Sequence, residues 1–472
     1  MKSKSAKPDT KNVDPIFQKY GAPFLVNSKG KVSINDRAVA VKCATQHGVT
    51  YNALAKGYER YDNPSGLWVS IHETEVMRLL DDLLIELGKQ YKQVEVTKRI
   101  TAAKLAALCK MLRPYDAGVQ GEDVMGKVHV KNGVLQLDRG DARLLSHDAR
   151  YAFHHSGNVT YDKKAACPKF LKEFLGEALE SDDIRILKMY CGSMLLGPNS
   201  CHGIMVIRGT PGGGKSTLVS IIEQVLGENN VAYLRTGHLN GRFETSAFLG
   251  KRLLVGKDVP GDTLAVSGAR MLKSLVGGDL MQAEVKFNPN KQAIRGDYHV
   301  MIVSNNKLRI ALDGDEDAWR RRLLVVDFKN PKPTRPIPNF AAKLVKKEAS
   351  GILNWLIEGA VEYRAQMESH GTLCLNEEQQ QRVDMLLENS DSVAQFVRQS
   401  VVPKVGKDVS TQELLLGYYR RCDSRDLTPV ASQAFFTRVP DLLAQMFKTI
   451  RRNDINRDGK AVRGFKGLAL NA

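Results

Sequence analysis

The sequence predicts an α/β fold whose core is built around a central parallel sheet. Three observations lead to this prediction. A glycine-rich stretch at 209–217 lies between an apolar run at 203–207 and a helix-like segment at 218–226. Segments in which apolar residues recur at helical spacing flank the middle of the chain. Three further apolar runs have the continuous hydrophobic character of buried strands and lie at 250–258, 298–304 and 323–328.

The glycine-rich stretch has the composition and context of a phosphate-binding loop. Its sequence, GTPGGGKST, matches G-x-x-x-x-G-K-S between a strand and a helix. Glycines let the backbone turn tightly and direct N–H groups at phosphate oxygens, and the following helix adds partial positive charge. We expect Lys215 to reach the β- and γ-phosphates and Ser216 to bind Mg²⁺; the alternative is a flexible loop without a ligand. The expected nucleotide-contacting residues are Gly209, Thr210, Pro211, Gly212, Gly213, Gly214, Lys215, Ser216 and Thr217.

The composition indicates a multidomain protein with a polyanionic partner. A chain of 472 residues is too long for one core of ordinary size. Its net charge of +17 suits a nucleic acid or an acidic membrane surface. No apolar run reaches the length that spans a bilayer, and the N-terminus lacks the apolar core of a signal peptide, so we expect a cytoplasmic protein without a membrane partner. The seven cysteines show no Cys-x-x-Cys pattern and are expected to be reduced.

Composition and local signals divide the chain into six parts. The first residues are polar, lysine-rich and interrupted by prolines. Helical spacing at 76–87 and 102–112, with an Asn132-Gly133 hairpin signal, indicates a mixed α and β region. A proline-rich connector at 329–338 ends the core. The expected parts are a flexible basic leader (1–30), an N-terminal α+β domain (31–160), a helical collar (161–200), the core (201–330), a helical extension (331–405) and a winged-helix-like domain (406–472).

Polar side chains follow two of the predicted core strands. Asp258 ends the run at 250–258, and adjacent strand ends are where a nucleotide site collects its magnesium ligands, so Asp258 is the candidate Walker B acid. Asn305 follows the run at 298–304, where an amide can orient an attacking water. The alternative for each residue is a structural role in a turn.

A hairpin predicted between these strands carries the candidate nucleic-acid contacts. Alternation around Asn288-Pro-Asn places Lys286, Phe287 and Lys291 near its tip. A cation for a phosphate beside a ring for stacking suits single-stranded DNA. A solvated hairpin with a buried phenylalanine would have a similar sequence.

Three arginines, Arg320, Arg321 and Arg322, come immediately before the last core strand. A planar guanidinium at a subunit boundary can stabilise the charge that develops on a neighbour's γ-phosphate. We therefore expect an arginine finger among these residues.

The last part of the chain has the pattern of a winged helix. Ser410 and Glu413 form a capping box before a helix at 414–422, and a second helix begins at Ser432. Strand-like segments at 448–452 and 461–470 would form a wing for duplex DNA, although a solvated basic tail would have the same composition. The wing cations are Lys448, Arg451, Arg452, Arg457, Lys460, Arg463 and Lys466.

Taken together, these motifs resemble the superfamily 3 helicases, specifically the poxvirus-type helicase module of phage and plasmid primase-helicases. The resemblance covers about residue 30 to the C-terminus, and the order of the motifs is more specific than any one of them. The matching segments begin at Asn132-Gly133, Tyr161-Asp162, Cys167-Pro168, Gly209, Gly250-Lys251, Lys273, Ser304-Asn305, Ala318-Trp319 and Gly351-Ile352.

The resemblance implies an AAA+-like core that assembles as a ring, a homo-hexamer, and couples ATP hydrolysis to movement of DNA through a central channel. It makes Asp258 the Walker B acid and Asn305 the polar sensor. The spacing from Arg322 to Phe328 is similar to that of papillomavirus-type replication helicases, which favours Arg322 over Arg321 as the finger. Lys286 and Phe287 correspond to the channel hairpin's DNA-contacting pair, and ATP with Mg²⁺ is the implied cofactor.

Two departures from the family pattern bear on function. The Walker B end usually presents glutamate, whereas Lys257-Asp258 offers one shorter carboxylate, which weakens its assignment as a base but not as a metal ligand. Too little chain precedes the collar for a primase domain, so primer synthesis is not expected and a separate primase is a candidate partner. The rival function is an ATP-switched DNA-binding initiator or packaging factor without motor activity. A small-molecule kinase or GTPase explains the basic charge less well.

Overall fold

The computed structural model describes residues 14–53, 56–114, 125–138, 140–261, 264, 268–284, 291–305, 308–312, 315–329, 337–425, 427 and 429–471. The chain separates into two compact units. One comprises Met1–Val124, Lys131–Val134 and Leu144–Ser156, and the other Met125–Val130, Leu135–Arg143 and Gly157–Ala472. In the part of the chain that the structure describes, we find no helix whose length and apolar character would let it cross a membrane.

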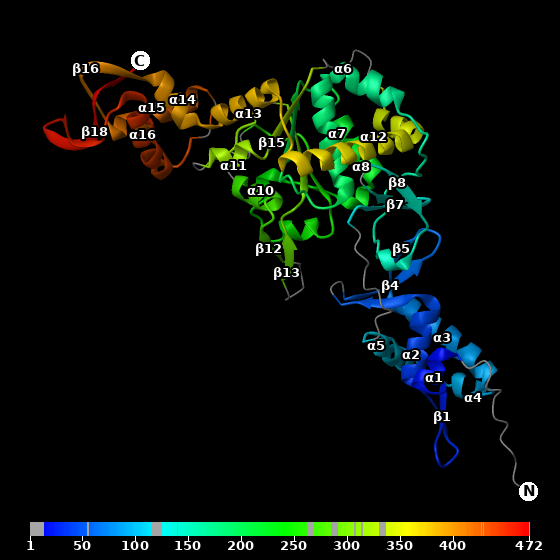
Figure 1. The fold of residues 1–472 in the computed structure, drawn as a ribbon. Coiled ribbons are helices and arrows are strands. Elements are labelled where there is room, and N and C mark those ends of the chain that lie inside the picture. Colours follow the sequence, from blue (N-terminus) through cyan, green and yellow to red (C-terminus); the bar gives the residue numbers. More distant parts are fainter. Residues whose placement is uncertain are drawn as a thin grey trace, which may run out of the picture. The chain divides into compact units, whose positions relative to one another are not determined.

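The first unit is a helical cluster with small antiparallel sheets (Figure 1). The apolar faces of α2, α3 and α5 share one core that includes Val39, Leu80 and Leu108. The helices predicted at 76–87 and 102–112 lie within α3 and α5. The elements are α1 (Pro15–Tyr20), β1 (Phe24–Val26), β2 (Val32–Ile34), α2 (Asp36–His47), β3 (Val49–Asn52), β4 (Gly57–Asp62), β5 (Leu67–Ile71), α3 (Glu73–Gln90), α4 (Val94–Thr97) and α5 (Ala102–Leu112).

Within the predicted flexible leader, residues 1–13 lie outside the described residues, whereas Pro15–Tyr20 and Phe24–Val26 form α1 and β1. Phe17 and Phe24 are buried in the core of the first unit, and both rings contact Tyr91. Asp14 caps α1 through a hydrogen bond from the backbone N–H of Ile16. Burial of two aromatic side chains therefore orders this part of the chain.

A three-stranded sheet follows, in the order β6-β7-β8. A turn at Lys131-Asn132 joins its first two strands, and Gly133 of the predicted hairpin signal is the first residue of β7. Its strands are β6 (Lys127–Val130), β7 (Gly133–Leu137) and β8 (Ala142–Leu145), followed by the short helix η1 (Ala149–Tyr151).

The second unit contains a five-stranded sheet in the order β10-β11-β14-β9-β15. Every neighbouring pair is parallel, which confirms the predicted parallel sheet. The strands β11 and β14 are buried along their whole length, which explains their continuous apolar sequences. The strands are β9 (Ile204–Gly209), β10 (Val231–Tyr233), β11 (Leu253–Gly256), β14 (His299–Ser304) and β15 (Leu323–Phe328).

Alternate side chains of this sheet enter two different cores. Met205 and Val255 pack with α7, α8 and α12, whereas Val206 and Leu254 pack with α10 and α13. The predicted collar forms η2, α6 and α7. The elements are η2 (Lys169–Leu175), α6 (Gly176–Ala178), α7 (Ser181–Leu196), α8 (Lys215–Leu226), η3 (Glu228–Asn230), η4 (Thr236–His238), η5 (Glu244–Phe248), α10 (Ala269–Val276), β12 (Leu280–Ala283), β13 (Gln292–Arg295), α11 (Glu316–Arg320), α12 (Phe340–His370) and α13 (Glu377–Ser390).

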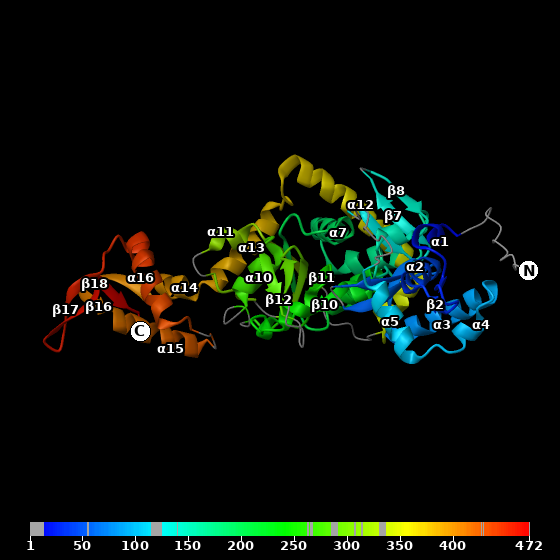
Figure 2. The same cartoon turned by 90° about the horizontal axis from the view of Figure 1, so that it is seen from below.

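The last elements of the chain, coloured orange to red in Figure 2, lie together. They surround a core of their own, which includes Phe396, Tyr418, Phe435 and Phe465. The predicted Ser410–Glu413 capping box is present, and a three-stranded sheet has the order β16-β18-β17. The domain boundary predicted between residues 405 and 406 falls inside β16. Because α14 and β16 both contribute side chains to this core, the last domain begins before that boundary. The elements are α14 (Ser392–Ser400), β16 (Val401–Ser410), α15 (Thr411–Ser424), α16 (Ser432–Phe447), β17 (Arg452–Arg457) and β18 (Lys460–Leu470).

Candidate functional site

The glycine-rich loop joins the carboxyl end of β9 to the first residue of α8. Gly212 and Gly214 have φ angles of 82° and 98°, a region that side-chain-bearing residues rarely adopt. A Cβ atom on Gly209 would lie 2.5 Å from the carbonyl oxygen of Phe328 on β15, so only glycine fits there. No side chain caps the N-terminus of α8. Its N–H groups are therefore free to bind an anion.

Lys215 lies in the first turn of α8 and is 3% exposed. Its ammonium group donates hydrogen bonds to the carbonyl oxygens of Gly209 (2.9 Å) and Thr210 (2.7 Å). Burial lowers the pKa of Lys215, and the nearby carboxylate of Asp258 acts in the opposite direction. Lys215 and Asp258 therefore interact electrostatically across the loop. The hydroxyl-bearing Ser216 is exposed beside them.

Asp258 follows β11 with an exposed side chain and a φ angle of 52°. Non-glycine residues adopt such angles only where the surroundings hold them. On one side, the Lys257 ammonium nitrogen lies 2.7 Å from a carboxylate oxygen of Glu223 on α8. On the other, the Val259 N–H donates to the carbonyl oxygen of Val303 (2.9 Å). These contacts fix the turn that presents Asp258.

Asn305 is exposed and comes directly after β14. β14 lies between β9 and β11, and Ser304 is opposite Arg208 in the register. The backbone of Asn305 therefore lies at the same edge of the sheet as the glycine-rich loop. It is positioned between that loop and Asp258. The structure thus brings Lys215, Asp258 and Asn305 to the carboxyl ends of three neighbouring strands.

The arginines lie at the opposite edge of the sheet. The Arg322 carbonyl oxygen accepts a hydrogen bond from the N–H of Ile204, the first residue of β9 (2.7 Å). The length of β9, roughly 17 Å, separates this position from Gly209. Arg322 is half-buried and donates to the carbonyl oxygen of Ala318 (2.7 Å), while its Nε is buried without a hydrogen-bond partner among the described residues. Burial and the charge of Arg321 lower the pKa of Arg322.

The other two arginines differ in their surroundings. Arg321 is exposed, whereas Arg320 forms ion pairs with Asp384 on α13 and with Asp317. The arginine finger therefore stays a prediction for Arg322 or Arg321, and Arg320 is committed to contacts within the chain.

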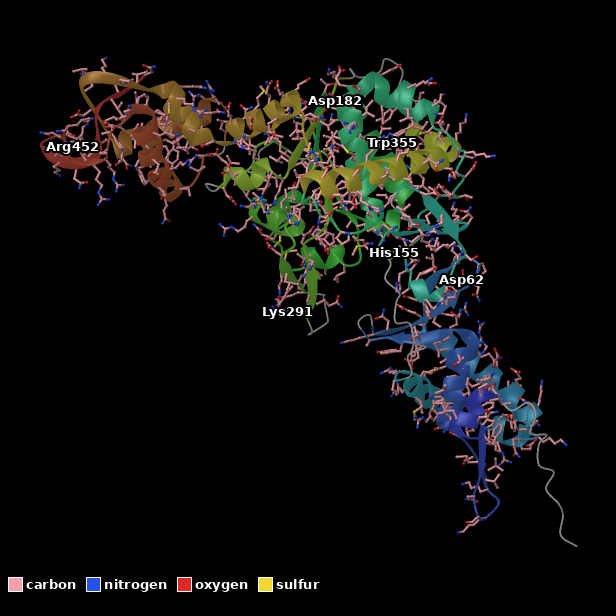
Figure 3. All side chains as sticks on the ribbon, in the orientation of Figure 1. Asp62, His155, Asp182, Lys291, Trp355 and Arg452 are labelled. Carbon is pink, nitrogen blue, oxygen red and sulfur yellow. The ribbon has the colours of Figure 1, made fainter. Side chains whose placement is uncertain are left out.

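The predicted DNA-binding hairpin consists of the antiparallel strands β12 and β13. Lys286 and Phe287 lie outside the residues that the structure describes. Lys291 is described, and its ammonium nitrogen lies 3.0 Å from a carboxylate oxygen of Glu284. Figure 3 shows Lys291 at the projecting end of the hairpin.

Sequence reasoning missed an ion pair at the base of the loop. Arg208 on β9 donates two hydrogen bonds of 2.8 Å to the carboxylate of Asp327 on β15. The two residues are opposite each other in the register, one position before Gly209 and Phe328. Charged residues of opposite sign within two otherwise apolar strands were the signal that could have revealed this pair.

The donor set fits a triphosphate with a divalent cation. The loop supplies N–H groups and a buried ammonium, and Ser216 and Asp258 supply oxygen ligands of the kind that Mg²⁺ prefers. Among the described residues, no three His, Cys, Asp or Glu side chains gather as a metal site by themselves. A magnesium ion here would therefore share its ligands with the phosphates.

These features define a mixed α/β protein with a five-stranded parallel sheet and a glycine-rich loop at its carboxyl edge. The model of a family of unknown function (DUF5906) matches residues 207–322, from the end of β9 to the last of the three arginines. No curated protein matches the chain.

Two solved structures of the NrS-1 C-terminal region are similar to the chain. The apo structure is 12% identical, with 88% of this chain and 95% of that chain covered and a TM-score of 0.44. An A form of the apo structure is 11% identical, with coverages of 89% and 96% and a TM-score of 0.43.

Proposed function

We propose that this chain is an ATP-dependent DNA helicase with an AAA+-like core, that it works as a homo-hexameric ring, and that it serves replication of a phage, plasmid or other mobile element. One observation carries the proposal. The loop with Lys215, the carboxylate of Asp258 and the amide of Asn305 lie at the ends of adjacent strands, and the Asn305 strand is in the middle. Such an arrangement surrounds a γ-phosphate with a cation, a metal ligand and a polar group for water.

Each residue has a separate part in hydrolysis. Lys215 and the N–H groups of α8 bind and orient the phosphates. Ser216 and Asp258 would hold Mg²⁺, and the ion would supply positive charge to neutralise the phosphates. Asn305 orients the attacking water by a hydrogen bond. Asp258, the carboxylate whose charge acts on Lys215, would accept the proton of that water.

The position of the arginines supports assembly into a ring. Arg322 lies at the edge of the sheet opposite to the glycine-rich loop of its own chain. Its guanidinium would therefore act on the site of a neighbouring subunit. Its buried Nε has no hydrogen-bond partner among the described residues, and such a group calls for an anion. A triphosphate bound to the adjacent subunit would supply one, and hydrolysis would then depend on assembly.

Charge on two other elements supports binding of DNA. Lys291 lies beside β13 of the β12–β13 hairpin, which would contact single-stranded DNA in the channel of the ring. The C-terminal domain carries Arg451, Lys460 and Arg463 as exposed cations, with no ion pair to any described residue. These would contact duplex phosphates.

Hydrolysis and strand separation test the proposal. The wild type should hydrolyse ATP faster with single-stranded DNA and should unwind a forked duplex. Lys215→Ala should abolish both activities, whereas Lys251→Ala, a change of a half-buried lysine just before β11 that donates to the Asn229 carbonyl oxygen, should abolish neither. Lys286→Ala should prevent unwinding and leave basal hydrolysis. ATP-dependent DNA binding with neither stimulation nor unwinding would favour an initiator or packaging factor.

A further inference from the structure

The solvent face of the β12–β13 hairpin carries Glu284 and Arg295, which the sequence motifs did not single out, beside the predicted DNA contact Lys291. Ala283 and Ile294 face inward and are buried. The alternate residues point outward, so Glu284, Lys291 and Arg295 share the exposed face. Leu280, which is opposite Arg295 in the register, is 76% exposed on the same face.

A second element adds a cation and a ring to this face. Arg242 and Phe243 precede η5, and the Arg242 guanidinium lies 5.4 Å from the centre of the Phe243 ring. Phe243 is nevertheless 46% exposed. The next residue, Glu244, is buried and accepts a hydrogen bond from Arg235 (3.0 Å). This anchor holds Phe243 at the surface, where an aromatic side chain costs solvation unless something stacks on it.

Glu284 links the two elements. One of its carboxylate oxygens lies 2.5 Å from Arg242 Nε, and the other lies 3.0 Å from Lys291 Nζ. These two cations lower the pKa of Glu284, which keeps it ionised. A single carboxylate therefore holds two cations of two different elements in place, and both cations remain largely exposed.

We infer that Arg242, Phe243, Lys291 and Arg295 form a contact site for single-stranded DNA, and that Glu284 is an internal counter-ion which a DNA phosphate displaces. A base stacks on the open face of Phe243, and the flanking phosphates take the cations released by Glu284. Because a phosphate must first displace the carboxylate, DNA binds more weakly than it would to the same cations without Glu284. Each contact with the DNA is therefore readily reversible. The inference rests on the proposed function only for the identity of the nucleic acid.

The test is equilibrium binding of a fluorescent oligothymidine to the full chain without nucleotide, measured by anisotropy over a range of salt. Glu284→Gln should tighten binding about threefold to tenfold at low salt and steepen the salt dependence, because two cations become available to phosphates. Phe243→Ala should weaken binding about tenfold with little change in the salt dependence, because stacking carries no charge.

Matched controls separate these effects from general ones. Glu358→Gln removes an exposed carboxylate that pairs with Lys188, and Met385→Ala removes an exposed apolar side chain on α13. Neither change should alter the affinity. If Glu284→Gln and Phe243→Ala also bind as the wild type does, the inference is wrong.

ATP hydrolysis by the same preparations distinguishes the two proposals. A wild type that hydrolyses ATP with DNA stimulation, together with an unchanged Glu284→Gln affinity, would overturn this inference alone. A wild type without hydrolysis, together with tighter binding by Glu284→Gln, would support this inference and overturn the helicase.

Discussion

The ammonium nitrogen of Lys257 lies 2.7 Å from a carboxylate oxygen of Glu223, so the residue beside Asp258 is tied to the helix that begins at Lys215. Glu223 is 8% exposed and lies about two turns along α8 from Lys215. Its other oxygen is buried without a hydrogen-bond partner among the described residues. The Lys257–Glu223 pair therefore connects the two chain segments that carry the glycine-rich loop and Asp258, the proposed metal ligand.

The first prediction concerns this pair. Lys257→Met should destabilise the protein by about 1–3 kcal/mol, because it leaves the buried Glu223 carboxylate without its cation. Chemical denaturation measures the loss. The double variant Lys257→Met with Glu223→Gln should lose less than the sum of the two single variants, because the unpaired charge is gone. Strict additivity would show that the pair contributes no coupling.

The second prediction concerns the arginines. Arg322→Ala should retain ATP binding and lose about a thousandfold in hydrolysis, the smaller end of the range for an arginine finger. Arg321→Ala is measured in parallel, and Arg320→Ala, which breaks the Asp384 ion pair, is the control for stability.

Mixing experiments show whether the arginine acts on a neighbour. Lys215→Ala subunits keep their arginines, and Arg322→Ala subunits keep their loops. A mixture of the two inactive variants should therefore recover part of the hydrolysis through mixed interfaces. No recovery at any ratio would mean that Arg322 does not complete a neighbour's site.

The strands of the core could be predicted from sequence because they are buried on both faces, as β11 and β14 are, and because the glycine-rich loop has a local pattern. Their order could not. Arg208 and Asp327 are 119 positions apart and meet only through the β9–β15 register. Nothing local to either residue sets that pairing.

Two other differences have identifiable causes, the first non-local and the second local. Phe17 and Phe24 lie close to prolines and polar residues, and their burial depends on contacts with Tyr91 far along the chain. The strand expected at 448–452 lies instead at Arg452–Arg457, in the segment expected to be a turn. Arg452 and Asp454, two positions apart on one face of that strand, form an ion pair (2.9 Å) that stabilises the extended backbone.

The third prediction concerns pH. His299 is fully buried at the start of β14, and burial lowers its pKa from 6.5 to about 3. The folded state therefore binds this proton less readily than the unfolded chain. The free energy of unfolding is therefore unaffected by titration of this histidine above pH 6.5. It falls as the pH drops from 6.5 toward 3, by up to about 1.4 kcal/mol per pH unit.

Denaturation at several pH values measures this slope. His299→Gln removes the titrating group, so its stability should fall less steeply below pH 6.5 than that of the wild type. The same change at the exposed His370 is the control. Parallel pH profiles for His299→Gln and wild type would contradict the assignment.

The fourth prediction separates the wing cations by their surroundings. Arg452 and Lys466 both pair with Asp454, at 2.9 and 3.0 Å, and Arg457 pairs with Glu413 at 2.8 Å. These cations are partly neutralised within the domain. Arg451, Lys460 and Arg463 are exposed and form no ion pair with a described residue, so we expect them to supply the affinity for duplex DNA.

Replacement of these three residues by alanine should weaken duplex binding and reduce the slope of log affinity against log salt by about three. Arg457→Ala should act differently. The Arg457 hydrogen bond is the largest cause that lowers the pKa of Glu413 to about 2, so this contact adds stability that is present above pH 4.5 and lost as the pH falls toward 2. Loss of the Arg457–Glu413 contact should therefore lower the melting temperature at neutral pH. The slope of log affinity against log salt should change by less than the amount expected for one phosphate contact. If Arg457→Ala reduces the salt slope as much as Lys460→Ala does, the ion pair with Glu413 does not keep Arg457 from the DNA, and the division of the wing into free and neutralised cations fails.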